Sequence, residues 1–299
     1  METTYFYNNA FINALKGKTH YEVPDLEEGY RAGTKGYSFP NGFKGDFSST
    51  LREENLFRRY GTEMLVKDCD ENILTVVSTA EAEVCEDGEA YPEDSDEFEK
   101  IPFMAYKIAS LCKISDTFIY DNKFDIQKYI TNEFARRFGR AEERYFISGT
   151  GIGEPTGILN AADTGVETAE LTYDDVVKLF FSVKPEYRKK AVWVVNDDTA
   201  LKLRTFKNSA GDYIWNHSDN TILGRPVEIS NHMPNAESGN KPIFFGDLSY
   251  FWILQRDNLY VRALTEKYIL NGAIGYIGTE RLDGKLVKSE AVKTLKITA

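Results

Sequence analysis

The stretch FDIQKYITNEFARRFGRAEERYFISGTG, residues Phe124 to Gly151, decides the fold because it holds the strongest periodic pattern in the chain. Its apolar residues recur at spacings of three or four, at Ile126, Ile130, Phe134, Phe138, Ala141 and Tyr145. This spacing places them on one face of an α-helix, which is about 35 Å long at about 1.5 Å per residue. We expect the solvated side of the helix to carry Arg136, Arg137, Arg140, Glu142 and Glu143.

The glycine-rich segment GTGIGEPTG, Gly149 to Gly157, follows this helix. Closely spaced glycines can bind phosphate, but a dinucleotide fingerprint has G-x-G-x-x-G between a strand and a helix. Here the spacing differs, the segment follows a helix, and no Gly-Lys-Ser/Thr ending is present. The glycines therefore predict the end of the helix and a turn, with Pro155 preventing continuation.

From Leu171 the pattern alternates between helix and strand. Thr172 and Asp175 resemble a capping box that opens a helix ending near Pro185, and a second helix is expected from about Thr199 to Phe206. The continuous apolar run AVWVVN, residues 191–196, is typical of a strand buried on both faces. Further strands are predicted at PVEIS (226–230), PIFFGDLSYFWIL (242–254) and LYVRAL (259–264). The pattern indicates an α+β fold with a mixed sheet.

The charge is concentrated in one place. The chain has 299 residues, 42% of them apolar, and a net charge of −11, which excludes a disordered chain and disfavours a general nucleic-acid binder. Ten carboxylates and no Lys or Arg lie between Glu81 and Glu99, so the rest of the chain carries only about −1. Self-repulsion favours an extended, solvated loop there.

The flanks of this acidic stretch are strand-like. ILTVVSTA (73–80) is rich in β-branched residues, and FMAYKIASLCKIS (103–115) alternates as strands do. Two such arms predict a long hairpin with an acidic tip, although a simple mobile surface loop would show the same charge. Because an isolated two-stranded ribbon is marginal in water, we expect it to rest on something, such as a neighbouring chain.

The residues that carry chemistry form no recognisable catalytic, cofactor or metal site. His20, His217 and His232 are far apart, the three cysteines are scattered, and no G-x-S-x-G elbow is present. No signal peptide and no apolar run long enough to cross a membrane are visible. We predict a protein without enzymatic activity or cofactor that is made in the cytoplasm.

Four motifs in the same order resemble the major capsid proteins of tailed bacteriophages, the family with the Hong Kong 97-type shell fold. They are residues 124–161, LGRPVEISNHMP (223–234), IFFGDLSYFWI (243–253) and GYIGTERLDGKLVKSEAVKTLKI (275–297). The resemblance covers about residues 60 to 299. It implies a subunit with an N-terminal arm, an extended hairpin, a peripheral domain with a long spine helix, and an axial domain.

The resemblance also implies domain boundaries. Residues 1–59 would be the arm lying against neighbours, and 171–267 the axial domain. Residues 60–170 and 268–299 would form the peripheral domain, including the extended loop 74–115, the spine helix 124–148 and a last strand around 286–297.

What the resemblance implies for function is assembly. Copies would form pentamers and hexamers that close into an icosahedral virion shell around double-stranded DNA, without sequence-specific binding, in the host bacterial cytoplasm. A separate scaffolding protein, a portal and cement proteins are the expected partners. From the charge pattern we expect the acidic loop to contact basic residues of a neighbour, and the candidates are Glu81, Glu83, Glu86, Asp87 and Glu89 with Arg58, Arg59, Arg136, Arg137 and Arg140.

Two other readings stay open at this point. An encapsulin-like nanocompartment shell would keep the fold and enclose enzymes in place of DNA. A soluble α+β enzyme would use a cleft beside Gly149 to Gly157 to bind a nucleotide.

Some relatives join subunits covalently through a lysine of the extended loop and an asparagine of the next subunit. Between Asp68 and Glu99 this sequence has no lysine. We therefore predict that mature particles separate into single subunits on denaturing electrophoresis. A ladder of covalent multimers would contradict this.

Overall fold

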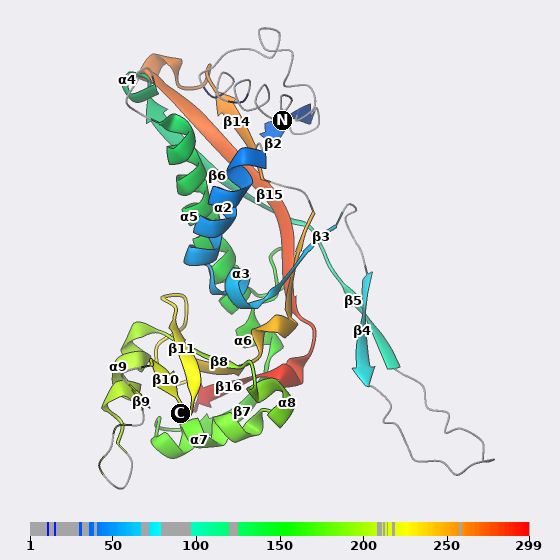
Figure 1. Ribbon diagram of the computed structural model, residues 1–299, viewed down its shortest axis with the longest axis vertical. Helices are drawn as coiled ribbons and strands as arrows, with labels where there is room; N and C mark the ends of the chain where they lie inside the picture. Colours follow the sequence, from blue (N-terminus) through cyan, green and yellow to red (C-terminus); the bar gives the residue numbers. More distant parts are fainter. Residues whose placement is uncertain are drawn as a thin grey trace, which may run out of the picture.

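The first of the two larger sheets among the described residues is built around β15 (Ala273–Leu286), which runs along the long axis of the molecule (Figure 1). The computed structural model describes residues 11, 15, 30–31, 36–38, 41–66, 72–78, 97–119, 125–207, 211, 213, 215–216, 219–256 and 259–298. Strand order in this sheet is β1-β2-β14-β15-β13-β3, with β6 on the other edge of β15. The bounds are β1 (Tyr30–Arg31), β2 (Gly36–Ser38), β3 (Thr62–Leu65), β6 (Tyr106–Ser115), β13 (Phe251–Gln255) and β14 (Tyr260–Leu264).

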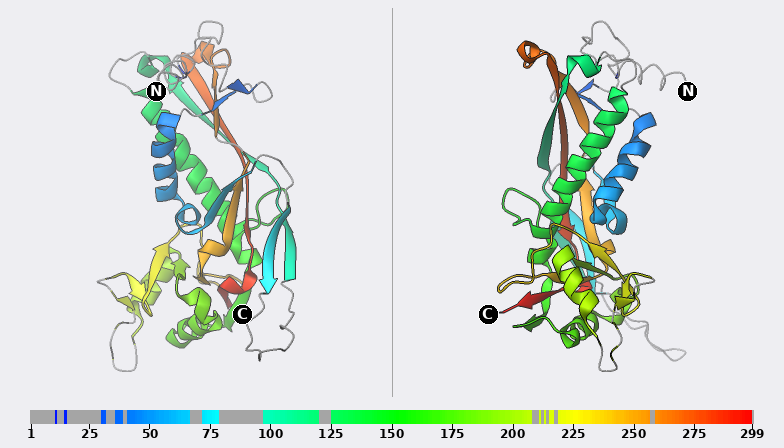
Figure 2. Two further views of the ribbon diagram at one scale, coloured as in Figure 1. Left: turned by 45° about the vertical axis from the view of Figure 1, so that its right-hand side comes forward. Right: turned by 90° about the vertical axis from the view of Figure 1, so that its left-hand side faces the viewer.

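Two helices, α5 (Ile126–Ser148) and α2 (Asn41–Glu54), cover one face of this sheet (Figure 2). Asp125 caps α5 by accepting a hydrogen bond from the Lys128 N–H, and α5 ends where the Gly149 N–H donates to the Tyr145 carbonyl. The predicted long helix is thus confirmed. Two short helical segments lie next to the ends of strands in this sheet. Helix α4 (Asp116–Ile119) directly follows β6, and the 3-10 turn η4 (Ile269–Asn271) precedes β15.

Helix α5 packs directly on β15 because the strand has glycine at two contact points. A Cβ atom on Gly278 would lie 2.9 Å from the ring of Phe138 and 3.0 Å from that of Phe134. A Cβ atom on Gly284 would lie 2.5 Å from the ring of Phe146. Larger side chains at either position would therefore force the helix away from the strand.

The buried face of α5 differs from the expected one in its last turns. Residues 126, 130, 134 and 138 are buried as predicted, but the stripe continues through Glu142 and Phe146. Ala141 and Tyr145 are only half-buried. Glu142 and Glu143, which the sequence placed in solvent, are buried because α3 (Leu56–Tyr60) packs over that side of α5.

The second sheet lies below the first in Figure 1 and has the order β7-β16-β12-β8-β11-β10-β9. Its strands are β7 (Asp163–Thr168), β8 (Val192–Val195), β9 (Trp215–Asn216), β10 (Thr221–Ile222), β11 (Arg225–Ile229), β12 (Ile243–Gly246) and β16 (Val292–Ile297). All four residues of β8 are buried, as expected for a central strand. Nearby helices are α6 (Ile158–Ala161), α7 (Tyr173–Ser182), α8 (Pro185–Arg188) and α9 (Asp197–Thr205), and the Thr172–Asp175 capping box of α7 is present.

The segment 242–254 forms two strands that belong to different sheets. Asp247 accepts a hydrogen bond from the Ser249 N–H and starts the 3-10 turn η3 (Leu248–Tyr250). This turn separates β12 in the second sheet from β13 in the first. The chain crosses back after β15, through η5 (Ser289–Ala291), to reach β16.

The pairing of strands does not follow the predicted domain boundaries. Strands β13 and β14 were placed in the axial segment 171–267 but pair with β15, whereas β7 and β16, placed in the peripheral domain, pair within the second sheet. Within the predicted arm 1–59, Phe11, Leu15, Phe47 and Leu51 are buried in the subunit's own core with residues of α5. Sequence pattern misses this because pairing is set by contacts far apart in the chain.

The extended hairpin has one arm that differs from the prediction. Strand β4 (Asn72–Ser78) pairs with β5 (Glu97–Pro102) in a separate two-stranded sheet that stands off the body in Figure 1. Residues 103–115 were expected as the second arm, but β6 pairs with β15. The base of the hairpin is anchored by Ile73 and Ile101, which pack in a cluster with Phe103 and Leu254. No helix among the described residues is long and apolar enough to span a membrane.

Candidate functional site: a buried arginine and a basic sheet face

The acidic residues predicted to contact a neighbour lie outside the described part of the chain. These are Glu81, Glu83, Glu86, Asp87 and Glu89. Strands β4 and β5 bracket them, and near the start of the described second arm Glu99 and Lys100 are exposed.

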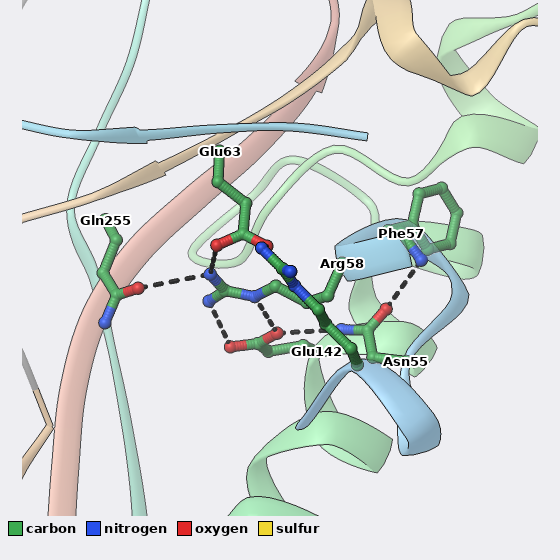
Figure 3. Close-up of polar contacts among 7 residues, drawn as sticks. Asn55, Phe57, Arg58, Glu63, Glu142 and Gln255 are labelled. Atoms are coloured by element: carbon green, nitrogen blue, oxygen red, sulfur yellow. Dashed lines mark hydrogen bonds and ion pairs between the residues drawn. The ribbon is translucent and has the colours of Figure 1, made fainter. Parts of the chain in front are cut away.

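Arg58 is buried inside its own subunit. It is 3% exposed, and its Nε and Nη2 atoms donate to the two carboxylate oxygens of Glu142 at 2.9 and 2.8 Å (Figure 3). Its Nη1 donates to Glu63 at 3.3 Å and to Gln255 at 3.2 Å. Burial alone would lower the pKa of Arg58, but attraction and hydrogen bonding by Glu142 outweigh it and raise that pKa. The prediction of Arg58 as an intersubunit contact loses its support, because Arg58 is buried and each of its three side-chain nitrogens donates within the subunit.

The neighbouring acid, Glu143, connects the two sheets. One of its oxygens accepts from the Leu56 N–H at 3.0 Å, at the start of α3. The other accepts from the hydroxyl of Ser230, which directly follows β11, at 2.5 Å. Asn55 completes the junction, since its amide donates to Glu142 and its carbonyl oxygen accepts from the Phe57 N–H. We call the cluster of Asn55, Arg58, Glu142, Glu143 and Glu280 the buried junction.

The four other candidate arginines are on the surface but already have partners in their own subunit. Arg59 pairs with Glu228 at 3.1 Å. Arg136 and Arg140 share Glu54, at 3.6 and 2.9 Å. Arg137 pairs with Glu133 and also donates to the Leu111 carbonyl.

A different surface carries basic side chains that have no carboxylate partner among the described residues. It is the face of the first sheet opposite α5 and α2, which none of the helices of the described residues covers in Figure 2. The strand register places Lys107 beside Arg281, and it places Ile277 between Leu111 on β6 and Arg262 on β14. Lys107, Leu111, Arg262 and Arg281 are exposed. We call these residues, with Lys113, the basic sheet face.

The charges on the basic sheet face are arranged unfavourably for an isolated subunit. Like charges directly opposite each other on neighbouring strands are destabilising, and Lys107 and Arg281 are such a pair. An anionic group placed between them would relieve the repulsion. The sequence reasoning missed this surface because β6 was assigned to the hairpin; the alternation of Lys107, Ala109, Leu111 and Lys113 along β6 was the available signal.

The glycine-rich turn offers little to an anionic ligand. The Gly157 N–H donates to the Gly149 carbonyl, and the Thr150 N–H and hydroxyl both donate to the Glu154 carboxylate. A carboxylate of the chain thus takes donors that a phosphate would need. No group of three metal-binding side chains occurs among the described residues.

Comparisons with known proteins agree on one fold. A model of the phage capsid family matches residues 35–297. The structure is similar to that of the capsid of an empty GTA particle, with 25% identity, a TM-score of 0.72, and coverage of 82% of this chain and 90% of that chain.

Two more distant structures show the same fold. A protein of Gordonia phage Cozz has 13% identity, a TM-score of 0.61, and coverage of 82% of this chain and 87% of that chain. The holo-SrpI encapsulin complex from Synechococcus elongatus PCC 7942 has 14% identity, a TM-score of 0.56, and coverage of 80% and 86%. A search of curated proteins finds no match. The predicted α+β fold of the Hong Kong 97 type is confirmed.

The two adjacent arginines of α3 give a matched test of the junction. We predict that Arg58→Met destabilises the subunit by about 3–5 kcal/mol, because it leaves buried carboxylates without their cation. Arg59→Met should cost less than about 1 kcal/mol, since its ion pair is exposed. Urea unfolding of the unassembled chain measures both. Equal effects of the two substitutions would show that Arg58 is not held as described.

Proposed function

Because this chain belongs to the phage capsid family and is a major capsid protein, we propose that it assembles as pentamers and hexamers into the icosahedral shell of a tailed phage. The shell would enclose double-stranded DNA without sequence-specific contacts and would be built in the host cytoplasm. The observation that carries the proposal is the match of a phage capsid family model to residues 35–297. The resemblance stated from the motifs alone is thereby confirmed.

The geometry supports a protein that is completed by copies of itself. The two-stranded sheet of β4 and β5 stands off the body in Figure 1, and no helix of the described residues covers the basic sheet face in Figure 2. Both features suit a subunit that overlaps its neighbours. We infer a separate scaffolding protein, a portal and cement proteins as further partners. An encapsulin-like shell has weaker support, because the likeness to an encapsulin at 14% identity extends to the fold alone.

Electron microscopy of the expressed protein, alone and with a candidate scaffolding protein, tests the proposal. We expect closed shells hundreds of ångströms across that show five-fold and quasi-six-fold capsomers. Small compact particles of a few subunits would contradict it. Shells that copurify with an enclosed enzyme and exclude DNA would favour the encapsulin-like alternative.

We also propose which surface receives the acidic stretch 81–99 of a neighbour. Arg59, Arg136, Arg137 and Arg140 were the surface candidates, but each already has a carboxylate partner within its subunit. The basic sheet face has none among the described residues and places two like charges side by side. Charge complementarity therefore favours this face as the receiving surface.

Charge-reversal substitutions test whether the basic sheet face or the arginines of α5 receive the acidic stretch. We predict that Lys107→Glu with Arg281→Glu slows assembly at least about tenfold at low salt, because the attraction that steers association is lost. Arg136→Glu with Arg140→Glu should have a smaller effect, and the wild type should slow as salt rises. Light scattering during assembly measures all three.

A compensating change makes the contact test specific. Replacing Glu81 and Glu83 by lysine should restore part of the rate in the Lys107→Glu, Arg281→Glu variant and slow the wild type. If the α5 pair proved the more sensitive one, the receiving surface would be α5. If neither pair mattered, charge would not guide the loop.

A further inference from the structure

Glu280 on β15 is a buried acid without a donor of its own. It lies on the face of the strand that α5 covers and is 2% exposed. Neither of its carboxyl oxygens receives a hydrogen bond from any donor among the described residues. A buried carboxylate with no donor is costly, so this acid requires an explanation.

The carboxyl group that Glu280 contacts is that of Glu142 on α5, and the two are within hydrogen-bonding reach. The Glu142 oxygens already accept from Asn55 and from two nitrogens of Arg58. Ionised carboxylates are acceptors only, so a hydrogen bond between these two acids requires a proton on one of them. Since Glu142 is the better supplied with donors, the proton belongs on Glu280.

The surrounding charges point the same way. Arg58 from α3 is the cation facing the pair, and its donors go to Glu142, to Glu63 on β3 and to the neutral Gln255 on β13. One arginine therefore faces three carboxyl groups, of which Glu63 is partly exposed and solvated. Burial raises the pKa of Glu280 well above its usual value, the charge of Glu142 adds to the rise, and Arg58 opposes it.

We propose that Glu280 is protonated at neutral pH and donates to Glu142, so that one buried proton holds α5 to β15, and that its loss at alkaline pH loosens this joint. The joint is a proton-operated switch between the helix and the strand on which it packs. Loss of the proton leaves two negative charges against a single arginine in a dry site. The consequence for a shell rests on the proposed function: subunit shape, and with it assembly, would respond to pH.

The sign of the pH dependence follows from proton linkage. The folded chain keeps the Glu280 proton at pH values where the unfolded chain has lost it, above about 4.5. Folding stability therefore falls as pH rises from that value through the raised pKa of Glu280. Across this window the bound proton contributes about a tenfold rise in the unfolding constant per pH unit.

The test compares Glu280→Gln with wild type in the unassembled full-length chain. An amide can donate to Glu142 as the protonated acid does, but it does not titrate. Urea unfolding from pH 5 to pH 9 should show the ratio of the two unfolding constants changing about tenfold per pH unit until the folded wild type itself loses the Glu280 proton, since Glu280→Gln has no proton to lose there. The control, Glu63→Gln, removes a partly exposed carboxyl from the same arginine and should keep the wild-type slope.

A second measurement does not depend on the variant folding. A protonated carboxylic acid has an infrared carbonyl band distinct from that of a carboxylate, so native wild type should retain one buried acid band at pH 7 and lose it on alkaline titration. Amide hydrogen exchange in α5 should speed up over the same pH range. Parallel pH profiles of wild type and Glu280→Gln, or no acid band at pH 7, would overturn the proposal.

The outcome for the joint and the outcome for the shell can be told apart. Proton linkage in the isolated chain without particle formation would uphold the joint and contradict the proposed function. Shell formation by the wild type without proton linkage in the isolated chain would uphold the proposed function and contradict the joint. If both hold, Glu280→Gln should shift the pH limit of assembly upward.

Discussion

The direct contact between α5 and β15 is the constraint on which the rest of this structure depends. Gly278 and Gly284 let the rings of Phe138 and Phe146 rest on the strand backbone, and no other residue type would leave that space. The same close approach fixes what lies between those two contacts. Glu142 and Glu280 lie there, and neither can reach water. Close packing of helix on strand thus creates the buried acids, and the acids require Arg58.

The buried junction also sets how the two sheets are joined. Glu142 holds Arg58 and Asn55, while its neighbour Glu143 reaches Leu56 and Ser230. At the end of α3, the Tyr60 hydroxyl donates to Glu228 on β11. Burial and this carboxylate raise the pKa of Tyr60 to about 12. The five-residue helix α3 therefore makes polar contacts both with α5, which packs on the first sheet, and with β11 of the second sheet. Buried ion pairs of this kind add little net stability, but their geometry leaves few alternative arrangements.

Sequence pattern predicted the elements that depend on residues close together in the chain. The long helix, the capping box at Thr172 and the buried strand at 192–195 were all predicted, because each depends on residues close in sequence. Sheet membership was not, since the separation of β12 from β13 depends on a turn at Asp247 and on partners far along the chain. The buried acids were missed for a narrower reason. A spacing of four continued beyond Phe138 leads to Glu142 and Phe146, which are buried. The prediction instead assigned Ala141 and Tyr145 to the buried face because they are apolar.

The distribution of charge favours association of this chain with further copies of itself. Nearly all its net charge lies between Glu81 and Glu99, in the part of the sequence that follows β4 and runs into β5, while basic side chains without a described carboxylate partner gather on one face of the first sheet. Like charges repel within each concentration, and the basic side chains have no carboxylate partner among the described residues. Contact between the two, in neighbouring copies, would relieve both at once. Exposed charge pairs are individually weak and screened by salt, so such contacts form and break readily. Many weak contacts per subunit allow a misplaced copy to leave before a closed surface traps it, whereas a few strong ones would not.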